Sequence, residues 1–354
     1  HYSEQVLLPL ATPTTEVVNQ YNAGNADGVF GVGTIANFWG ISAFDGPNVS
    51  NPFIIISQRT PSNVIRKLDL NTNHLSTIAG LAGTTGHVDG GIGTSRIHDP
   101  MGQAISPDGS YILFTGAGAP KPPGAVPHGN GGRVKKLDLS TNIVTTLVEI
   151  NNPTGIAIHP TLNYAYIITY PGQLLRMNLS DNTYPIEVLV NDVGGKGYPL
   201  SISPDGTFLL AVVSATPWQL KRINLRSNGT MTGNLETINV SGGVPSATYS
   251  IDIMADNDTV IMGNKIFKIT NPSSLIHTLT DGAAYGITRT QTMSHAYKLN
   301  TNYALTKVNL SQSAPVTPNY YFKQHTSQLK DTNNSPKVVW AMEIDDNDNI
   351  FVCF

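Results

Sequence analysis

The sequence predicts an all-β protein, folded as a single β-propeller of four-stranded blades. Two local patterns and their spacing carry this prediction. The first pattern is a strand of alternating apolar and polar residues, with a basic residue before the last apolar pair. It recurs about every 40 to 70 residues, which is typical of propeller blades. Its copies are VIRKLDL (64–70), RVKKLDL (133–139), QLLRMNL (173–179), QLKRINL (219–225), KIFKIT (265–270) and ALTKVNL (304–310).

The second pattern is a strand, a tight turn and another strand, and it lies upstream of the first. We expect it to form the two inner strands of each blade. The C-terminal copy contains Asp345, Asn347 and Asn349 at the spacing that opens an EF-hand loop, but Ile350 stands where that loop needs glycine, so we interpret it as a hairpin turn. The copies are GQAISPDGSYILFTG (102–116), GIAIHPTLNYAYIIT (155–169), LSISPDGTFLLAVVS (200–214), SIDIMADNDTVIMGN (250–264) and AMEIDDNDNIFVCF (341–354).

Counting inner strands predicts seven blades in one domain, residues 1–354. We expect blade 7 to combine 338–354 with N-terminal strands within 4–24, because this closure leaves no free sheet edge. Residues 286–305 contain no clear inner turn, so six blades are the alternative. The expected inner strands are 38–44, 101–106, 154–159, 199–203, 249–254, 285–290 and 339–344.

Residues 64–116 resemble an NHL-type propeller repeat. They combine the basic strand RKLDL, the strand end TIAG, the loop DGGIG and the turn SPDG, and residues 22–42 are a degraded copy. This resemblance implies the propeller fold. It does not imply one function, because such propellers include enzymes, receptor ectodomains and interaction modules.

Composition excludes some partners. Charged residues are 13% and the net charge is −3, which favours neither nucleic acid nor an anionic membrane as partner. The longest apolar runs, such as PFIIIS, are far too short to span a membrane. The single cysteine, Cys353, excludes an internal disulfide and a cysteine-based zinc site.

Several features favour a secreted glycoprotein. The chain begins at His1, which suggests a processed N-terminus from which a signal peptide was removed. Most sequons fall in turns that the blade pattern places on one face, the short-turn face. The alternative is that asparagine is simply a good turn residue. The seven sequons are at Asn48, Asn178, Asn228, Asn239, Asn257, Asn309 and Asn333.

The opposite face, the loop face, receives the long connections before each inner strand and between the second and third strands. Long loops on a rigid scaffold concentrate binding residues. Trp218, with Trp39 and Trp340 near the channel mouth, would suit a sugar or a peptide through stacking. Trp39 and Trp340 could instead be buried between blades. The predicted ligand or partner residues on this face are His87, Asp89, His98, Asp99, Lys121, His128 and Trp218.

Two sets of residues suggest metal ions. Asp252 and Glu343 lie in one column of the inner strands, where they could share calcium or another divalent cation in the central channel, or be paired with hydroxyls or lysines. The loop from His87 to Asp99 offers two imidazoles and two carboxylates to zinc or another transition metal. Its Asp-Gly sequence also suits a turn. The remaining inner-strand positions are mostly small residues, which fit strands that converge on an axis.

The function that we expect is a secreted, non-catalytic extracellular binding or assembly module, such as a matrix, cell-surface or filament subunit. Its partners would be proteins, a second copy or glycans. No catalytic residue is predicted, since the chain has no G-x-S-x-G, H-E-x-x-H or phosphate-loop motif. The alternative is a propeller lyase or hydrolase with a metal at the channel mouth, held by His98, Asp252 or Glu343.

Overall fold

A computed structural model gives the structure of the chain. It describes residues 14–29, 31–45, 49–116, 118, 131–245, 248, 250–254, 256–279, 284–289, 295–300, 304–309, 341–344 and 350–353. The chain divides into two compact units, His1–Gln312 and Ser313–Phe354. Among the described residues, no helix has the length and hydropathy of a membrane span.

The first unit is built of four-stranded antiparallel sheets, five of which use four consecutive strands. In each of them the chain moves outward one strand at a time. Blade 1 is β2 (Phe38–Phe44), β3 (Phe53–Gln58), β4 (Val64–Asp69) and β5 (His74–Gly80). Blade 2 is β6 (Pro100–Ile105), β7 (Tyr111–Gly116), β8 (Gly131–Asp138) and β9 (Val144–Asn151). Blade 3 is β10 (Pro153–Ile158), β11 (Tyr164–Thr169), β12 (Leu174–Asn178) and β13 (Ile186–Val190).

The later blades follow the same plan. Blade 4 is β14 (Lys196–Ile202), β15 (Phe208–Ser214), β16 (Gln219–Leu225) and β17 (Met231–Ile238). Blade 5 is β18 (Ile251–Ile253), β19 (Thr259–Met262), β20 (Lys265–Lys268) and β21 (Asn271–Thr278). The six predicted basic strands correspond to the third strand of a sheet in every case, so this part of the prediction is confirmed.

The sixth sheet combines both ends of the first unit. It contains β22 (Ala284–Arg289), β23 (His295–Asn300), β24 (Ala304–Asn309) and, as its outer strand, β1 (Thr14–Gln20). β1 pairs antiparallel with β24, from Thr14 with Asn309 to Gln20 with Ala304. The sequence had instead predicted that strands within 4–24 would join the C-terminal hairpin. That hairpin, β25 (Ala341–Ile344) paired with β26 (Ile350–Cys353), lies in the second unit.

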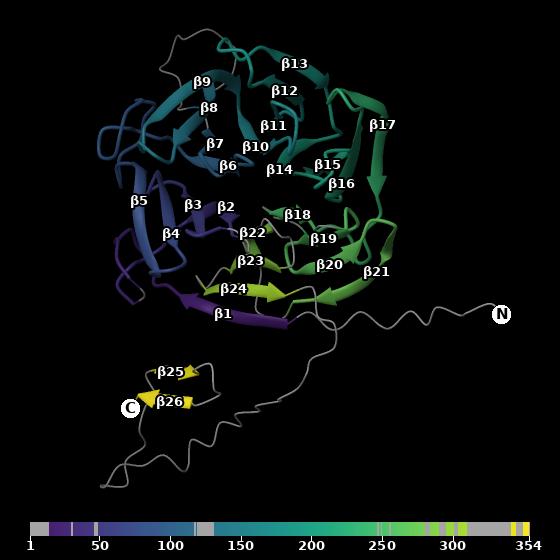
Figure 1. Cartoon of the computed structure of the whole chain (residues 1–354). Coiled ribbons are helices and arrows are strands. Elements are labelled where there is room, and N and C mark those ends of the chain that lie inside the picture. The colour runs from purple at the N-terminus through teal and green to yellow at the C-terminus, as the bar shows by residue number, and fades with distance from the viewer. Residues whose placement is uncertain are drawn as a thin grey trace, which may run out of the picture. The chain divides into compact units, whose positions relative to one another are not determined.

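The inner strands of the first unit contact one another in a closed cycle, β2, β6, β10, β14, β18, β22 and back to β2. Figure 1 shows the sheets radiating from this cycle, with β1 beside β24. The fold is therefore a β-propeller, as predicted. Six described inner strands form this cycle. The blade count, seven or the alternative of six, stays a prediction, because residues 310–340 lie outside the described residues.

The core lies between neighbouring blades. Ile54 and Ile56 of β3 pack into one hydrophobic cluster, whereas Phe53 and Ile55 pack with Ile112 of blade 2 into another. Strands that are buried on both faces read as continuous apolar runs rather than as an alternation. This explains the run FIIIS, and it means that each blade depends on both neighbours for its stability.

The basic residue of the repeated third strand has one structural role in four blades. It lies over an aromatic ring at the start of the neighbouring second strand, a diagonal cross-strand contact. Such cation–π pairs contribute about 0.5–1 kcal/mol each at exposed sites. The pairs are Lys67 on Phe53 (4.6 Å), Lys136 on Tyr111 (4.5 Å), Arg176 on Tyr164 (4.3 Å) and Arg222 on Phe208 (4.1 Å).

Candidate functional site

Irregularities in the inner strands shape the mouth of the central channel. The register shifts near the start of five of the six inner strands: between Phe38 and Gly40 in β2, Pro100 and Gln103 in β6, Pro153 and Gly155 in β10, Gly197 and Leu200 in β14, and Ala284 and Gly286 in β22. A β-bulge leaves a residue outside the ladder and re-aims its side chain. Trp39 and Tyr198 lie in two of these bulges, at the loop-face end of their strands.

The bulges also explain the small residues of the inner strands. A Cβ atom added to Gly40 would lie 2.5 Å from the carbonyl oxygen of Met101, and one added to Gly102 would lie 2.6 Å from that of Thr154. Gly155 meets the carbonyl of Tyr198 in the same way. Each glycine therefore admits the bulged backbone of the next blade, which only a residue without a side chain allows.

A small polar cavity opens between these bulges. Its volume is about 70 Å³, and its walls come from the inner strands of blades 1 to 5. The Oγ atom of Ser250, which lines it, is buried and has no hydrogen-bond partner in the structure. Buried polar groups are normally satisfied by protein or by ordered water. The lining residues are Trp39, Gly40, Ile41, Gly102, Gln103, Thr154, Gly155, Ile156, Pro199, Leu200, Ser250 and Ile251.

Four aromatic rings gather at this mouth, and we call Trp39, Tyr170, Tyr198 and Trp218 the mouth cluster. Tyr198 is at its centre, with ring centroids 6.4 Å from Trp39, 5.0 Å from Trp218 and 6.3 Å from Tyr170. Trp39 and Tyr198 come from blades 1 and 4, which are not neighbours in the ring, so the cluster extends across the channel. Three of the rings are half-buried, and Tyr170 is 37% exposed.

Two cations flank the mouth cluster. The guanidinium of Arg59 lies 4.1 Å from the ring centroid of Trp39 and is paired with the carboxylate of Asp99, to which Nε donates at 2.7 Å. The ammonium of Lys196 lies 4.6 Å from the ring centroid of Tyr170. A hydrogen bond with Tyr170 raises the pKa of Lys196 above its usual value, so this rim carries positive charge at neutral pH.

Asp89 is bonded to residues of β8 and β9. Its carboxylate accepts hydrogen bonds from Lys135 Nζ at 2.6 Å, from Thr146 N at 2.7 Å and from Thr146 Oγ1 at 2.8 Å. Lys135 is only 1% exposed. Burial alone would raise the pKa of Asp89, but the bonds from Lys135 and Thr146 outweigh it and lower that pKa below its usual value. Asp89 therefore neutralises a buried lysine and ties its loop to β9.

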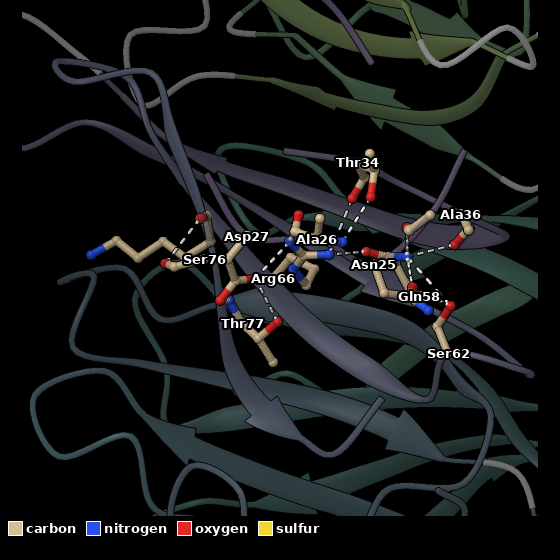
Figure 2. A network of polar contacts seen from close by, with 12 residues as sticks. Asn25, Ala26, Asp27, Thr34, Ala36, Gln58, Ser62, Arg66, Ser76 and Thr77 are labelled. Atoms are coloured by element: carbon tan, nitrogen blue, oxygen red, sulfur yellow. Dashed lines mark hydrogen bonds and ion pairs between the residues drawn. The ribbon is translucent and has the colours of Figure 1, made fainter. Parts of the chain in front are cut away.

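Blade 1 repeats this arrangement with Asp27, as Figure 2 shows. Asp27 Oδ1 accepts from the fully buried Arg66 at 2.7 Å and from Thr77 Oγ1 at 2.8 Å. Arg66 also donates to Gln58 Oε1 at 2.9 Å, and this buried amide in turn donates to Ala36 O at 2.8 Å. We call the sets Asp27–Arg66–Thr77 and Asp89–Lys135–Thr146 the two Asp clamps. They account for the Asp-Gly sequences at Asp27 and Asp89 in this chain.

The predicted four-residue metal set is not assembled. Asp89 belongs to a clamp and Asp99 is paired with Arg59, so of the four only His87 and His98 lie together, with ring centroids 5.7 Å apart. Neither nitrogen of His87 has a hydrogen-bond partner. Burial, and then the charges of Arg133 and Lys135, lower the pKa of His87 to about 4. Across the described residues, no three His, Cys, Asp or Glu side chains form a group that could hold a metal.

Of the two residues predicted to share a channel cation, Asp252 lies in the first unit. Asp252 accepts a hydrogen bond from Ser201 Oγ at 2.8 Å, which is the hydroxyl pairing that was the alternative interpretation. Glu343 lies in the second unit. A cation shared by Asp252 and Glu343 stays a prediction, because the side chain of Glu343 lies outside the described residues.

Some other predicted residues lie outside the described residues, namely Lys121, His128, Trp340, Asn48, Asn333 and the side chain of Asn309. Of the remaining sequons, Asn228 is exposed, and Asn178 and Asn257 are partly exposed in short turns, as expected. Asn239 is exposed but follows β17 and precedes β18, which places it towards the loop face. Occupancy of the sequons stays a prediction.

Comparison with known proteins supports the fold alone. No protein-family model matches the chain, and no curated protein matches it by sequence. An auxiliary nutrient binding protein from Bacteroides thetaiotaomicron is 13% identical, with a TM-score of 0.60 over 84% of this chain and 76% of that one. A gluconolactonase from Xanthomonas campestris is 11% identical, with a TM-score of 0.58 over 88% and 94%. A chain in a nidogen/laminin complex is 14% identical, with a TM-score of 0.52 over 71% and 84%.

Sequence reasoning identified Trp39 and Trp218 but missed Tyr170, Tyr198, Lys196 and Ser250. Tyr198 reaches the mouth only because β14 carries a bulge, and a bulge leaves no regular mark on the alternation of the strand. The one available signal was position: Tyr198, like Trp39, directly precedes a small or proline residue of the inner-strand column.

Proposed function

We propose that the chain is a secreted, N-glycosylated β-propeller that binds an extracellular partner without catalysis, and that the partner docks at the channel mouth. The observation that carries this proposal is the mouth cluster over the polar cavity. Clefts with aromatic walls and a few convergent polar groups are the usual form of ligand sites. The cluster lies on a rigid ring and has one ring, Tyr170, that is 37% exposed.

The state of the neighbouring charged groups supports binding over catalysis. A catalytic acid, base or metal ligand needs capacity left over for the substrate. Asp89 and Asp27 are instead occupied by buried cations, and Asp99 by Arg59. Asp252, on the channel side, accepts bonds from Ser201 Oγ and from the backbone of Ile253. Among the described residues, no group of three His, Cys, Asp or Glu side chains supports the alternative of a metal-dependent lyase or hydrolase.

Glycan placement supports the choice of face. Asn178, Asn228 and Asn257 lie in short turns at the other end of the strands from the mouth cluster. Glycans there would leave the mouth open to a partner. The chain could then act as a single binding module or as a repeating subunit whose copies meet through this face.

The test uses the full chain secreted from a eukaryotic host. Glycopeptide mass spectrometry should find sugar on Asn228, and metal analysis should find no ion in stoichiometric amount. Sedimentation velocity and tryptophan fluorescence, with matrix polysaccharides, peptides or added protein as probes, should report binding or self-association. Replacing Trp218 with Ala should weaken that response. A stoichiometric metal that is lost in Asp252→Asn, together with turnover of a sugar lactone or uronide, would favour the enzyme instead.

A further inference from the structure

We propose that the ligand of the mouth is a carbohydrate, with a sugar ring stacked on the mouth cluster and a hydroxyl-bearing substituent in the cavity. This inference rests on the proposed binding function and names its ligand class. It commits to a recognition chemistry that neither the fold nor the fold neighbours supply.

The stacking surface is the first argument. The ring centroid of Tyr198 lies 5.0 Å from that of Trp218 and 6.3 Å from that of Tyr170, and none of the three rings is fully buried. Aromatic rings offer a flat apolar face at low cost in conformational entropy, and Tyr and Trp keep a polar group at the edge. A pyranose matches such a surface, because one face of its ring presents C–H groups while its hydroxyls point outward.

The cavity beside the rings is the second argument. At about 70 Å³ it holds roughly five water molecules, at 10–15 Å³ each. That is too little for a whole hexose but enough for an exocyclic hydroxymethyl or carboxyl group. Ser250 is 6% exposed, lines this cavity and has an Oγ atom without a partner. A ligand hydroxyl would satisfy it, and an apolar substituent would not.

A peptide fits the same features less well. Peptides commonly bind by adding a strand to a sheet edge, but the bulges at Trp39 and Tyr198 interrupt the inner edges at the mouth. A proline-rich peptide could stack on the rings, yet proline has no donor for the cavity. Lys196 at the rim adds a cationic donor next to Tyr170, which suits the ring oxygens or an acidic group of a sugar.

The experiment begins with an array of neutral and acidic oligosaccharides, probed with the intact secreted chain beside a peptide array. Calorimetry with the strongest oligosaccharide then compares variants. We expect Trp218→Ala and Tyr170→Ala each to weaken binding by about 10-fold or more. Ser250→Ala should weaken it by about 3- to 10-fold.

Tyr164 provides the matched control. Tyr164 and Tyr170 flank opposite ends of β11, and each has a cation over its ring, Arg176 at 4.3 Å and Lys196 at 4.6 Å. Tyr164→Ala should bind the oligosaccharide like the unmodified chain. Equal losses in both tyrosine variants would overturn the proposal, because they would indicate a general loss of folding. Tyr170→Ser, at an exposed position, repeats the test without a new cavity in the core.

The outcomes separate the ligand class from the binding function. If no oligosaccharide binds but peptides or a second copy bind through Trp218, the carbohydrate inference is wrong and the binding function stands. If nothing binds at the mouth, both are wrong. Selective oligosaccharide binding that is lost in Trp218→Ala and kept in Tyr164→Ala supports both.

Discussion

The two Asp clamps and the mouth cluster belong to the same ring, yet their chemistry is opposite. In the clamps, the cations of Arg66 and Lys135 are buried, and both carboxylate oxygens of Asp89 are bonded to Lys135 or Thr146. At the mouth, half-exposed aromatic rings stand beside a hydroxyl that has no partner. The ion pairs of the Asp clamps therefore stabilise the fold, whereas the aromatic rings of the mouth cluster remain accessible to a ligand.

Removing one carboxylate should break a clamp most severely. Asp89→Ala leaves the ammonium of Lys135 buried without a counter-charge. We expect the free energy of unfolding to fall by about 2–4 kcal/mol, less than for a fully enclosed pair because Asp89 is 42% exposed. Urea unfolding followed by circular dichroism measures this.

Blade 3 supplies the rescue for that variant. Leu175 occupies the position of Lys135 there and is buried without any aspartate partner. The double variant Asp89→Asn with Lys135→Leu should recover most of the lost stability. A double variant no more stable than Asp89→Ala would show that the loop attachment through Thr146, rather than the charge of Lys135, dominates the clamp.

Substitution of a channel glycine, one of Gly40, Gly102 and Gly155, tests whether close packing of the inner strands shapes the mouth. Gly102→Ala places a methyl group against the carbonyl of Thr154, a backbone atom that cannot rotate away. Overpacking of this kind costs about 2 kcal/mol. We expect a lower midpoint of urea unfolding and weaker ligand binding at the mouth. Gly131→Ala is the control, since nothing lies within 4 Å of its added Cβ. An unchanged midpoint in Gly102→Ala would contradict the close packing.

Acid should reveal the buried histidine beside the second clamp. The pKa of His87 is about 4 when folded, against 6.5 in the unfolded chain, so the unfolded state takes up its proton first as pH falls. Stability should therefore decrease between pH 6.5 and 4, by about 1–2 kcal/mol from this residue. His87→Gln should flatten the curve in that interval, and parallel curves for both proteins would exclude this contribution.

The smallest effect is expected at the mouth itself. Tyr170→Ala should change the free energy of unfolding by less than about 0.5–1 kcal/mol, because the ring is 37% exposed and contacts Tyr198 only edge-on. Thermal unfolding measures it. A loss as large as that of Asp89→Ala would mean that the rings, like the clamps, are structural.

The local sequence pattern was sufficient to predict the repeated strands, but it did not predict which strands pair to close the ring. The basic residue of the third strand could be recognised in the sequence because in four blades it lies over an aromatic ring at a fixed offset, as Lys136 does over Tyr111. The choice of β24 as the partner of β1 depends instead on strands from the two ends of the ring, and an alternating pattern does not encode a partner. The number of blades stays a prediction for the same reason.

The residues of the candidate site also fall into those that the sequence could predict and those that it could not. Trp39 and Trp218 could be placed near the mouth from their position in the blade pattern. For Asp89 and Asp99 the sequence left a metal site and a turn open, because their partners, Lys135 and Arg59, are 46 and 40 residues away. The local sequence of a glycine-rich loop does not distinguish a carboxylate that binds a metal ion from one that neutralises a buried lysine.

The pairing of β1 with β24 also determines when the ring can close during synthesis of the chain. β1 is the first of the described strands to leave the ribosome, and β24, its partner, is the last strand of the ring to be made. Until then β1 is an unpaired edge, and β2 and β22 have not met. The propeller therefore cannot close cooperatively until nearly the whole first unit has emerged. During that interval the unpaired strand is open to pairing with a neighbouring nascent chain.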